Sequence, residues 1–207
     1  LQARVDHVGV RVGGRHQFYE GGAPRRVVKA AGEIDLQRAG QHALADVHGL
    51  SLQGEHDRRF DRLLLDGLGN DGPQGYRHYL RTIGRQRPQP GTPLTDPRWE
   101  VWASQVLQSF EDFQLLCAVR KGPWGVQGLN ERVSRVLHNA GLIDSQQPWY
   151  EGRPVLVTRN DYGLGLMNGD IGIALRLPDE QGVSLLRVAF PRNDGSGGVR
   201  FVLPSRL

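Results

Sequence analysis

The feature that most constrains the fold is a continuous apolar run from Phe113 to Val119, interrupted only by Gln114. A run this short and this apolar is typical of a strand that is buried on both faces of a parallel sheet. A glycine-containing loop at 121–125 follows, and residues 126–140 then place apolar side chains at helical spacing, with Gly141 positioned to end the helix. The order strand, loop, helix predicts an α/β fold.

Two helices are expected before this strand. Apolar side chains fall at helical spacing from Tyr76 to Ile83, and the proline-rich segment 87–93 ends that helix. A second helix is predicted to begin at Asp96-Pro97, because an acidic N-cap followed by proline at the first helical position is a start signal. Its apolar face consists of Trp99, Trp102, Val106, Leu107 and Phe110.

The C-terminal part has the sequence pattern of a small β-barrel. Apolar segments at 155–157, 171–177, 185–190 and 199–203 alternate with clusters of Asn, Asp and Gly, which are strong turn signals. Asp179-Glu180 falls between two of these segments. Since Pro178 precedes the pair and Gly182 follows it, we interpret the pair as a hairpin turn rather than a magnesium-binding acidic pair.

The N-terminal region, residues 1–64, is rich in Gly, Arg and His and stays unassigned, and its degree of order stays open. We expect one short strand through Val5, Val8, Val10 and Val12 and a helix over 33–48, while 59–65 is short and mixed. Residues 66–73 have the composition of a loop or a linker.

The charge balance favours a nucleic-acid partner. Lys and Arg together number 26 against 22 Asp and Glu, which gives a formal charge of +4, and only Lys29 and Lys121 are lysines. Arginine forks match phosphate oxygens and stack on bases; an arginine bias from a GC-rich genome is the competing explanation.

The single cysteine, Cys117, excludes an internal disulfide and a cysteine-based zinc site, and a buried position is expected. No apolar run is long enough to span a membrane, so we expect a cytoplasmic protein with no membrane partner.

The two lysines also test for an ATP site. A P-loop requires a lysine that is followed by Ser or Thr at the end of a glycine-framed loop. Ala30 follows Lys29 and Gly122 follows Lys121, so no standard P-loop is present and no cofactor is expected in this chain.

Histidines in the N-terminal region raise a metalloprotein as an alternative. His42, Asp46 and His48 lie close together, and His7, His16 and His56 share the region, but no zinc-site spacing is present. The segments 5–12 and 18–21 also resemble the first strand of vicinal-oxygen-chelate (glyoxalase-like) metalloproteins, in which the residue matching His7 would bind a metal. Solvated or structural histidines are the competing interpretation.

Three segments resemble the RecD family, the 5′-to-3′ helicase subunits of exodeoxyribonuclease V, in order and spacing: 113–132, 149–161 and 164–175. The final residues 203–207 match as well. The resemblance covers about 105–207 and is loose over 74–104. It implies a superfamily 1 helicase in which 74–145 is part of the second RecA-like domain and 149–203 is an inserted SH3-like β-barrel.

In that family the P-loop and the acidic magnesium site lie upstream of the matching segment, and the last helicase motifs lie beyond it. ATP and Mg are therefore expected only in a complete parent protein, and the chain is expected to be an inactive RecD fragment on its own. Residues 1–64 would be a different domain, a diverged one or an incorrect gene start.

The predicted DNA contacts combine this resemblance with position. A strand that ends at Val119 delivers the next residues to the carboxyl end of a parallel sheet, where ligands bind in α/β folds, beside the positive end of the following helix. The candidate DNA-binding residues are Arg120, Lys121, Gly122, Asn130, Arg159, Asn160 and Asn168. Structural turn roles are predicted for Gly125, Gly169, Asp170 and Gly172. Trp124 and Tyr162 are expected either to stack on bases or to be buried.

The function expected from these residues is contact with single-stranded DNA, together with interdomain structure, in recombinational DNA repair, with RecB and RecC subunits as partners. Two alternatives stay open: a stand-alone nucleic-acid-binding module and a histidine-based metalloprotein.

Overall fold

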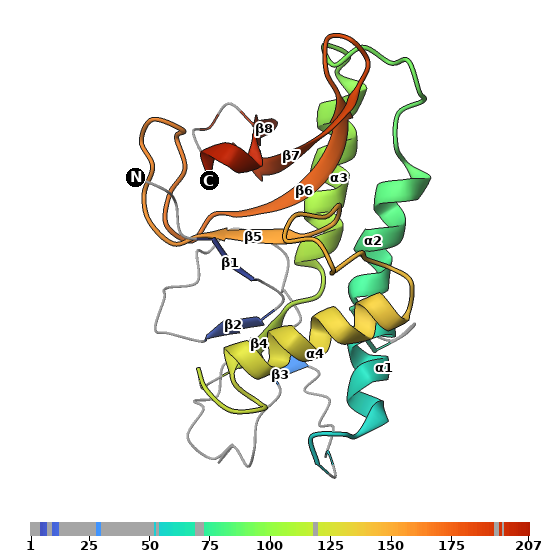
Figure 1. Ribbon diagram of the computed structural model, residues 1–207, viewed down its shortest axis with the longest axis vertical. Coiled ribbons are helices and arrows are strands. Elements are labelled where there is room, and N and C mark those ends of the chain that lie inside the picture. Colours follow the sequence, from blue (N-terminus) through green and yellow to red (C-terminus); the bar gives the residue numbers. More distant parts are fainter. Residues whose placement is uncertain are drawn as a thin grey trace.

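The computed structural model describes short strands at residues 5–7, 10–12 and 28–29, and then Leu52, 54–68, 73–117, 120–192, Gly195 and 197–207. These residues form a mixed α/β fold with four α-helices and two β-sheets (Figure 1). Within the described ranges, no helix combines the length and the apolar character that a membrane span requires.

The smaller sheet is parallel and has β4 (Leu115–Cys117) at its centre, between β2 (Val10–Val12) and β3 (Val28–Lys29). The predicted strand of a parallel sheet is confirmed, and so is the buried cysteine, because the side chains of Leu115 and Cys117 are buried. Leu116, which points to the other face, is half-buried.

The prediction of a single strand through residues 5–12 is wrong. It is replaced by β1 (Val5–His7) and β2, which belong to different sheets. An alternating pattern specifies extended backbone but not the partner strand, which explains the error. The helix expected over 33–48 lies outside the described residues.

Three helices lie where the periodicity predicts them: α2 (Tyr76–Arg85), α3 (Arg98–Glu111) and α4 (Val126–Asn139). Pro97 occupies the N-cap position of α3, one residue later than expected, and the Asp96 carboxylate accepts a hydrogen bond of 2.9 Å from the Arg98 backbone N–H.

A fourth helix, α1 (Arg58–Asp66), was not predicted, and the interpretation of 59–65 as short and mixed is wrong. Asp57 caps it by accepting a hydrogen bond of 2.9 Å from the backbone N–H of Arg59. The helix buries Phe60, Leu63 and Leu64, which lie on one face at helical spacing.

The larger sheet is antiparallel, in the order β1-β5-β6-β7-β8. Its strands after β1 are β5 (Pro154–Val157), β6 (Ile171–Pro178), β7 (Ser184–Pro191) and β8 (Val199–Val202), and a 3₁₀ helix follows at Pro204–Arg206. Between β6 and β7 the Asp179 carboxylate accepts hydrogen bonds from the backbone N–H groups of Gln181 and Val183. The predicted hairpin turn is therefore confirmed.

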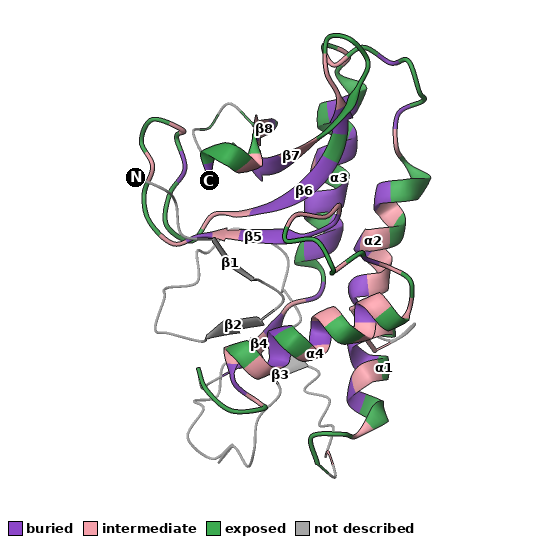
Figure 2. Ribbon diagram, in the orientation of Figure 1, coloured by how far each residue is buried: buried purple, intermediate pink, exposed green. Residues whose placement is uncertain are grey.

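The two faces of the antiparallel sheet contribute to two cores. Ile173, Leu175 and Leu177 of β6 pack in the core that contains the helices, whereas Ala174 points into a second core with Val188 and Phe190 of β7. Figure 2 shows the resulting buried residues along β6 and along α3 beside it. The strand period of two places alternate side chains in different cores, so each face of the sheet contributes to a core.

Candidate nucleic-acid interface

The loop that follows β4 presents cations to solvent. Arg120, Lys121 and Gly122 are all exposed. Among the described residues, neither Arg120 nor Lys121 takes part in an ion pair. Both charges are therefore available to an external anion at the carboxyl end of the parallel sheet, where the sequence predicts them.

Small residues shape this loop against the start of α4. Gly122 has φ of 87°, and its carbonyl accepts a hydrogen bond of 3.0 Å from the Gly125 N–H. A Cβ at Gly125 would lie 2.5 Å from the Lys121 carbonyl oxygen, and one at Gly128 would lie 2.6 Å from the Gly122 carbonyl oxygen. Backbone therefore lies in contact with backbone, and only glycine fits at these positions.

The N-terminus of α4 lies directly behind the two cations. Gly125 is its N-cap residue, and no side chain caps the first turn. The partial positive charge of an uncapped helix N-terminus adds to the field of Arg120 and Lys121. Trp124 is half-buried, with its ring centroid 5.4 Å from that of Phe60 in α1. It thus packs inward and is not placed to stack on a base.

Asn130 occupies a different environment from the loop. Its exposed fraction is 9%, and it lies in α4 next to the buried Leu129. Asn130 thus differs in burial from the exposed residues Arg120 and Lys121 with which the sequence groups it.

The β5–β6 connection, residues 158–170, brings together the other three candidate DNA-binding residues. Arg159, Asn160 and Asn168 are exposed. The Asn160 carboxamide accepts a hydrogen bond of 2.8 Å from the Asn168 N–H and donates one of 3.2 Å to the Tyr162 hydroxyl. Tyr162 is 79% exposed and Met167 is 44% exposed, so the loop offers an aromatic surface beside polar donors.

Turn chemistry holds this loop in place. The Asp170 carboxylate accepts a hydrogen bond of 2.7 Å from the Met167 N–H, and Gly169, with φ of 99°, donates one of 2.8 Å to the Val157 carbonyl. These positions have the conformations that the predicted turn roles require.

The turn role predicted for Gly172 is wrong, because Gly172 lies within β6, paired with Val155. A Cβ at this position would lie 2.7 Å from side-chain carbons of Phe190 and Val188. Glycine is therefore needed for packing in the second core.

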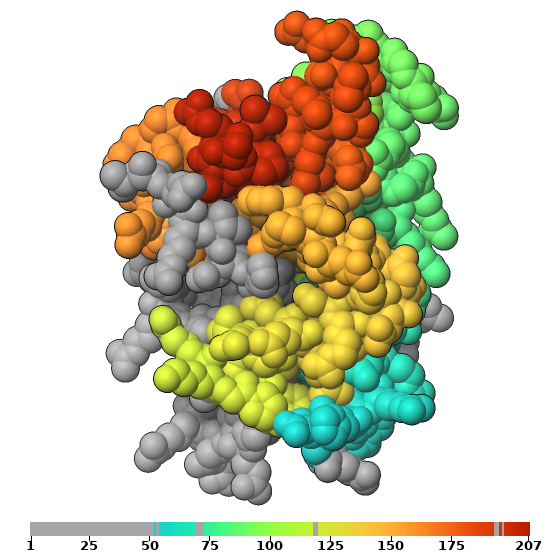
Figure 3. Space-filling model, viewed as in Figure 1, coloured from blue at the N-terminus to red at the C-terminus, as the bar shows by residue number. Residues whose placement is uncertain are grey.

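Figure 3 shows both loops on the face turned to the viewer, the β5–β6 loop at the upper left and the β4–α4 loop at the lower left. Atoms of α1 adjoin those of the β4–α4 loop along the lower edge (Figure 3).

A groove of about 610 Å³ lies between α2, the C-terminal end of α4 and Arg176. An Arg87–Glu151 ion pair of 2.6 Å lies at its edge, and Trp149 and Tyr150 form part of its wall. None of the predicted DNA-binding residues lines it, so the groove is not part of the candidate interface.

The described ranges contain no group of three or more His, Cys, Asp or Glu side chains that could hold a metal ion. His16, His42, Asp46 and His48 lie outside the described residues, as does the side chain of His7. His56 is described, and its Nε2 lies 3.6 Å from a carboxylate oxygen of Glu55. The metalloprotein alternative therefore stays a prediction.

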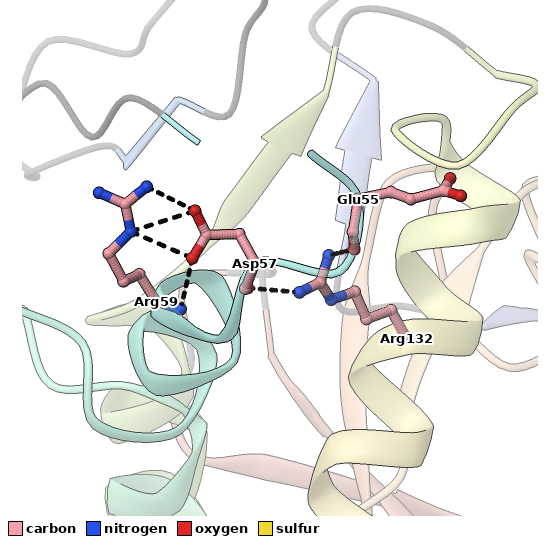
Figure 4. Close-up of polar contacts among 4 residues, drawn as sticks. All are labelled: Glu55, Asp57, Arg59 and Arg132. Atoms are coloured by element: carbon pink, nitrogen blue, oxygen red, sulfur yellow. Dashed lines mark hydrogen bonds and ion pairs between the residues drawn. The ribbon is translucent and has the colours of Figure 1, made fainter. Parts of the chain in front are cut away.

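The sequence prediction omitted Arg132, which joins α4 to the segment before α1 (Figure 4). Its side chain is 11% exposed and lies 2.8 Å from the Asp61 carboxylate.

The structure is a mixed α/β protein in which the two loops present exposed basic and polar side chains. No protein-family model matches the chain. Curated relatives do match: it is 45% identical to the RecBCD enzyme subunit RecD of Mycolicibacterium smegmatis over 75 residues, which is 36% of this chain and 14% of that protein. The RecD of Mycobacterium tuberculosis is 47% identical over 72 residues, 35% of this chain and 12% of that protein.

The RecBCD enzyme subunit RecD of Haemophilus influenzae extends the similarity to 137 residues at 28% identity, 65% of this chain and 20% of that protein. The chain thus spans between 12% and 20% of the length of these relatives. The resemblance to RecD predicted from the sequence is confirmed.

Proposed function

We propose that the chain acts as a segment of a RecD-type 5′-to-3′ helicase subunit and contacts single-stranded DNA in recombinational repair. Residues 74–145 would then be part of the second RecA-like domain, and 149–203 the inserted SH3-like barrel. RecB-type and RecC-type subunits would be the partners, because the relatives are named as subunits of RecBCD. ATP hydrolysis would require motifs that are not found in this sequence.

The observation that carries the proposal is the β4–α4 loop. Two exposed cations without ion-pair partners in the described ranges stand at the carboxyl end of a parallel sheet and in front of an uncapped helix. Such an arrangement attracts phosphate through charge, through backbone N–H groups and through the helix dipole together.

The β5–β6 loop supports the same function by a different interaction. Tyr162 is 79% exposed, although a tyrosine ring contributes most to stability when it is buried. An aromatic side chain held at the surface by a hydrogen bond from Asn160 suits base stacking, which tolerates any base.

The test is binding of the full chain to a fluorescent oligo(dT) strand across a salt series. Arg120→Gln with Lys121→Gln removes two phosphate contacts, so the slope of log affinity against log salt should become shallower by about 1.4, since each contact on a single strand contributes about 0.7. The matched control is Arg81→Gln with Arg85→Gln, two exposed arginines of α2. Absence of binding at low salt, or an equal effect of both pairs, would reject the proposal.

A stand-alone nucleic-acid-binding module is the second candidate, and the second core of the antiparallel sheet favours it. If this candidate is correct, affinity for the strand will not change when RecB and RecC subunits are added. ATPase activity measured with single-stranded DNA separates both candidates from a motor, because robust turnover would contradict the absence of an ATP site.

A further inference from the structure

We infer that Arg132 is a positioning residue that fixes the β4–α4 loop, and with it Arg120 and Lys121, against α1. The inference rests on the proposed function for its consequence in DNA binding, while the positioning itself rests on contacts in the structure. Neither Arg120 nor Lys121 forms an ion pair with a described residue that would fix its position. We therefore ask which contacts of the β4–α4 loop with α1 fix the two side chains.

All three guanidinium nitrogens of Arg132 donate hydrogen bonds to α1 or to the segment just before it. Figure 4 shows the two that reach the carbonyls of Glu55 and Asp57. Nε donates to the Asp61 carboxylate at 2.8 Å, one terminal nitrogen donates to the Asp57 carbonyl at 2.7 Å, and the other donates to the Glu55 carbonyl. Two backbone acceptors and one carboxylate therefore share one planar donor group, which fixes its orientation.

The plane of the same guanidinium covers aromatic rings. Its central carbon lies 4.7 Å from the Phe60 ring centroid and 5.9 Å from the Trp124 ring centroid. The two rings meet edge to face, with an interplanar angle of 76°. Phe60 is fully buried, so it anchors the cluster, and Trp124 is the part of the β4–α4 loop that joins it.

Trp124 is the side chain that ties the loop to the rest of the molecule. Arg120, Lys121, Gly122 and Pro123 are exposed, whereas Trp124 packs against the main core. A change that loosens Trp124 therefore loosens the neighbouring exposed residues, because within 120–124 the other four residues lie at the surface.

Arginine is required here for geometric reasons. Lysine keeps the charge but has a single nitrogen, so it cannot donate to three acceptors in one plane. Asp57 assists from the other side. Its carboxylate accepts hydrogen bonds from the N–H and guanidinium of Arg59, and its carbonyl accepts one of 3.1 Å from the Phe60 N–H in addition to the one from Arg132.

The experiment compares the full chain with Arg132→Lys and Arg132→Gln. The matched control is Arg135→Gln, an exposed arginine one turn further along α4. Hydrogen exchange read by mass spectrometry reports on the peptide that contains residues 120–125, and oligo(dT) affinity is measured in parallel. We expect faster exchange confined to this peptide and to the start of α1, and about tenfold weaker binding, equivalent to about 1.4 kcal/mol, in both Arg132 variants but not in the control.

Unchanged exchange at 120–125 would overturn the inference, and so would faster exchange with unchanged affinity. If Arg132→Gln does not fold, the Lys variant decides, because it keeps the charge beside Asp61. In the Lys variant, exchange that is accelerated in peptides of β5–β8 as much as in 120–125 would also overturn the inference. Arg132 would then stabilise the whole fold and not the loop in particular. If the unmodified chain binds no DNA, the proposed function fails, and exchange at 120–125 still decides whether Arg132 positions the loop.

Discussion

Replacement of Gly172 by alanine tests the packing of the antiparallel sheet directly. The added methyl carbon would lie 2.7 Å from both Phe190 and Val188, whose side chains are fully buried. The backbone of Gly172 lies outside the left-handed region, so steric overlap is the only obstacle. Overpacking of this kind costs about 1–3 kcal/mol, which for a chain of this size lowers Tm by about 2–4 °C per kcal/mol.

Urea unfolding followed by circular dichroism measures the free energy of unfolding of Gly172→Ala. Gly84→Ala is the matched control, because Gly84 lies in α2 with nothing within 4 Å of an added Cβ. Alanine favours a helix over glycine by about 0.8–1 kcal/mol, so the control should become more stable while Gly172→Ala becomes less stable. The same chemical change is thus expected to have opposite signs at the two positions.

A double-mutant cycle with Phe190→Leu identifies the cause. If the Phe190 ring is what the new methyl group meets, the double variant will be more stable than the sum of the single effects predicts. Gly172→Ala with stability within about 0.5 kcal/mol of the unmodified chain, or a cycle with no coupling, would refute the argument from packing.

Further predictions concern three other contacts. Tyr162→Ala should weaken oligo(dT) binding by about 1–3 kcal/mol with unchanged Tm, because the ring is 79% exposed; an equal loss in Tm would contradict this. Tyr79→Phe removes a buried hydrogen bond of 2.9 Å to the Gly152 carbonyl and should lower the free energy of unfolding by about 1–3 kcal/mol, whereas a neutral result in urea unfolding would count against it. Hydrogen bonds from the Arg98 side chain and backbone lower the pKa of Asp96 from 3.8 to about 2, so its carboxylate stabilises the start of α3 above pH 3.8 and loses this effect as pH falls toward 2. The Tm difference between Asp96→Asn and the unmodified chain should therefore shrink over that interval, and a constant difference would exclude the carboxylate as its source.

Local sequence patterns predicted the helices and strands whose conformation is determined by their own residues. The apolar face of α3 and the apolar run around β4 are strong sequence signals, because tertiary packing buries the same side chains that set the local periodicity. Helix α1 was missed since only three of its nine residues are buried and charged residues interrupt the pattern; the signal available was Asp57 as an N-cap before Phe60 and Leu63.

The pairing of strands that are far apart in the sequence could not be predicted from local patterns. The partners of β1 and β2 lie more than a hundred residues away, at β5 and β4, so period-two alternation predicts a strand without predicting its sheet. The same limit applies to the candidate interface: exposed residues of one loop are neighbours in sequence and were predicted, whereas Arg132 and Asp61 are 71 residues apart and were not.

The alternation of side chains along β6 between two cores has a consequence for how such a chain can vary over evolutionary time. Extra residues are tolerated where no side chain enters either core, and the exposed tip of the β6–β7 hairpin at 180–183 meets this condition; loop lengthening there carries a small entropic cost. Deletion of α3 would instead bring Ile173, Leu175 and Leu177 into water. Descendants of this sequence are therefore expected to differ in length at the hairpin tip and to gain or lose the helices and the sheet as one unit.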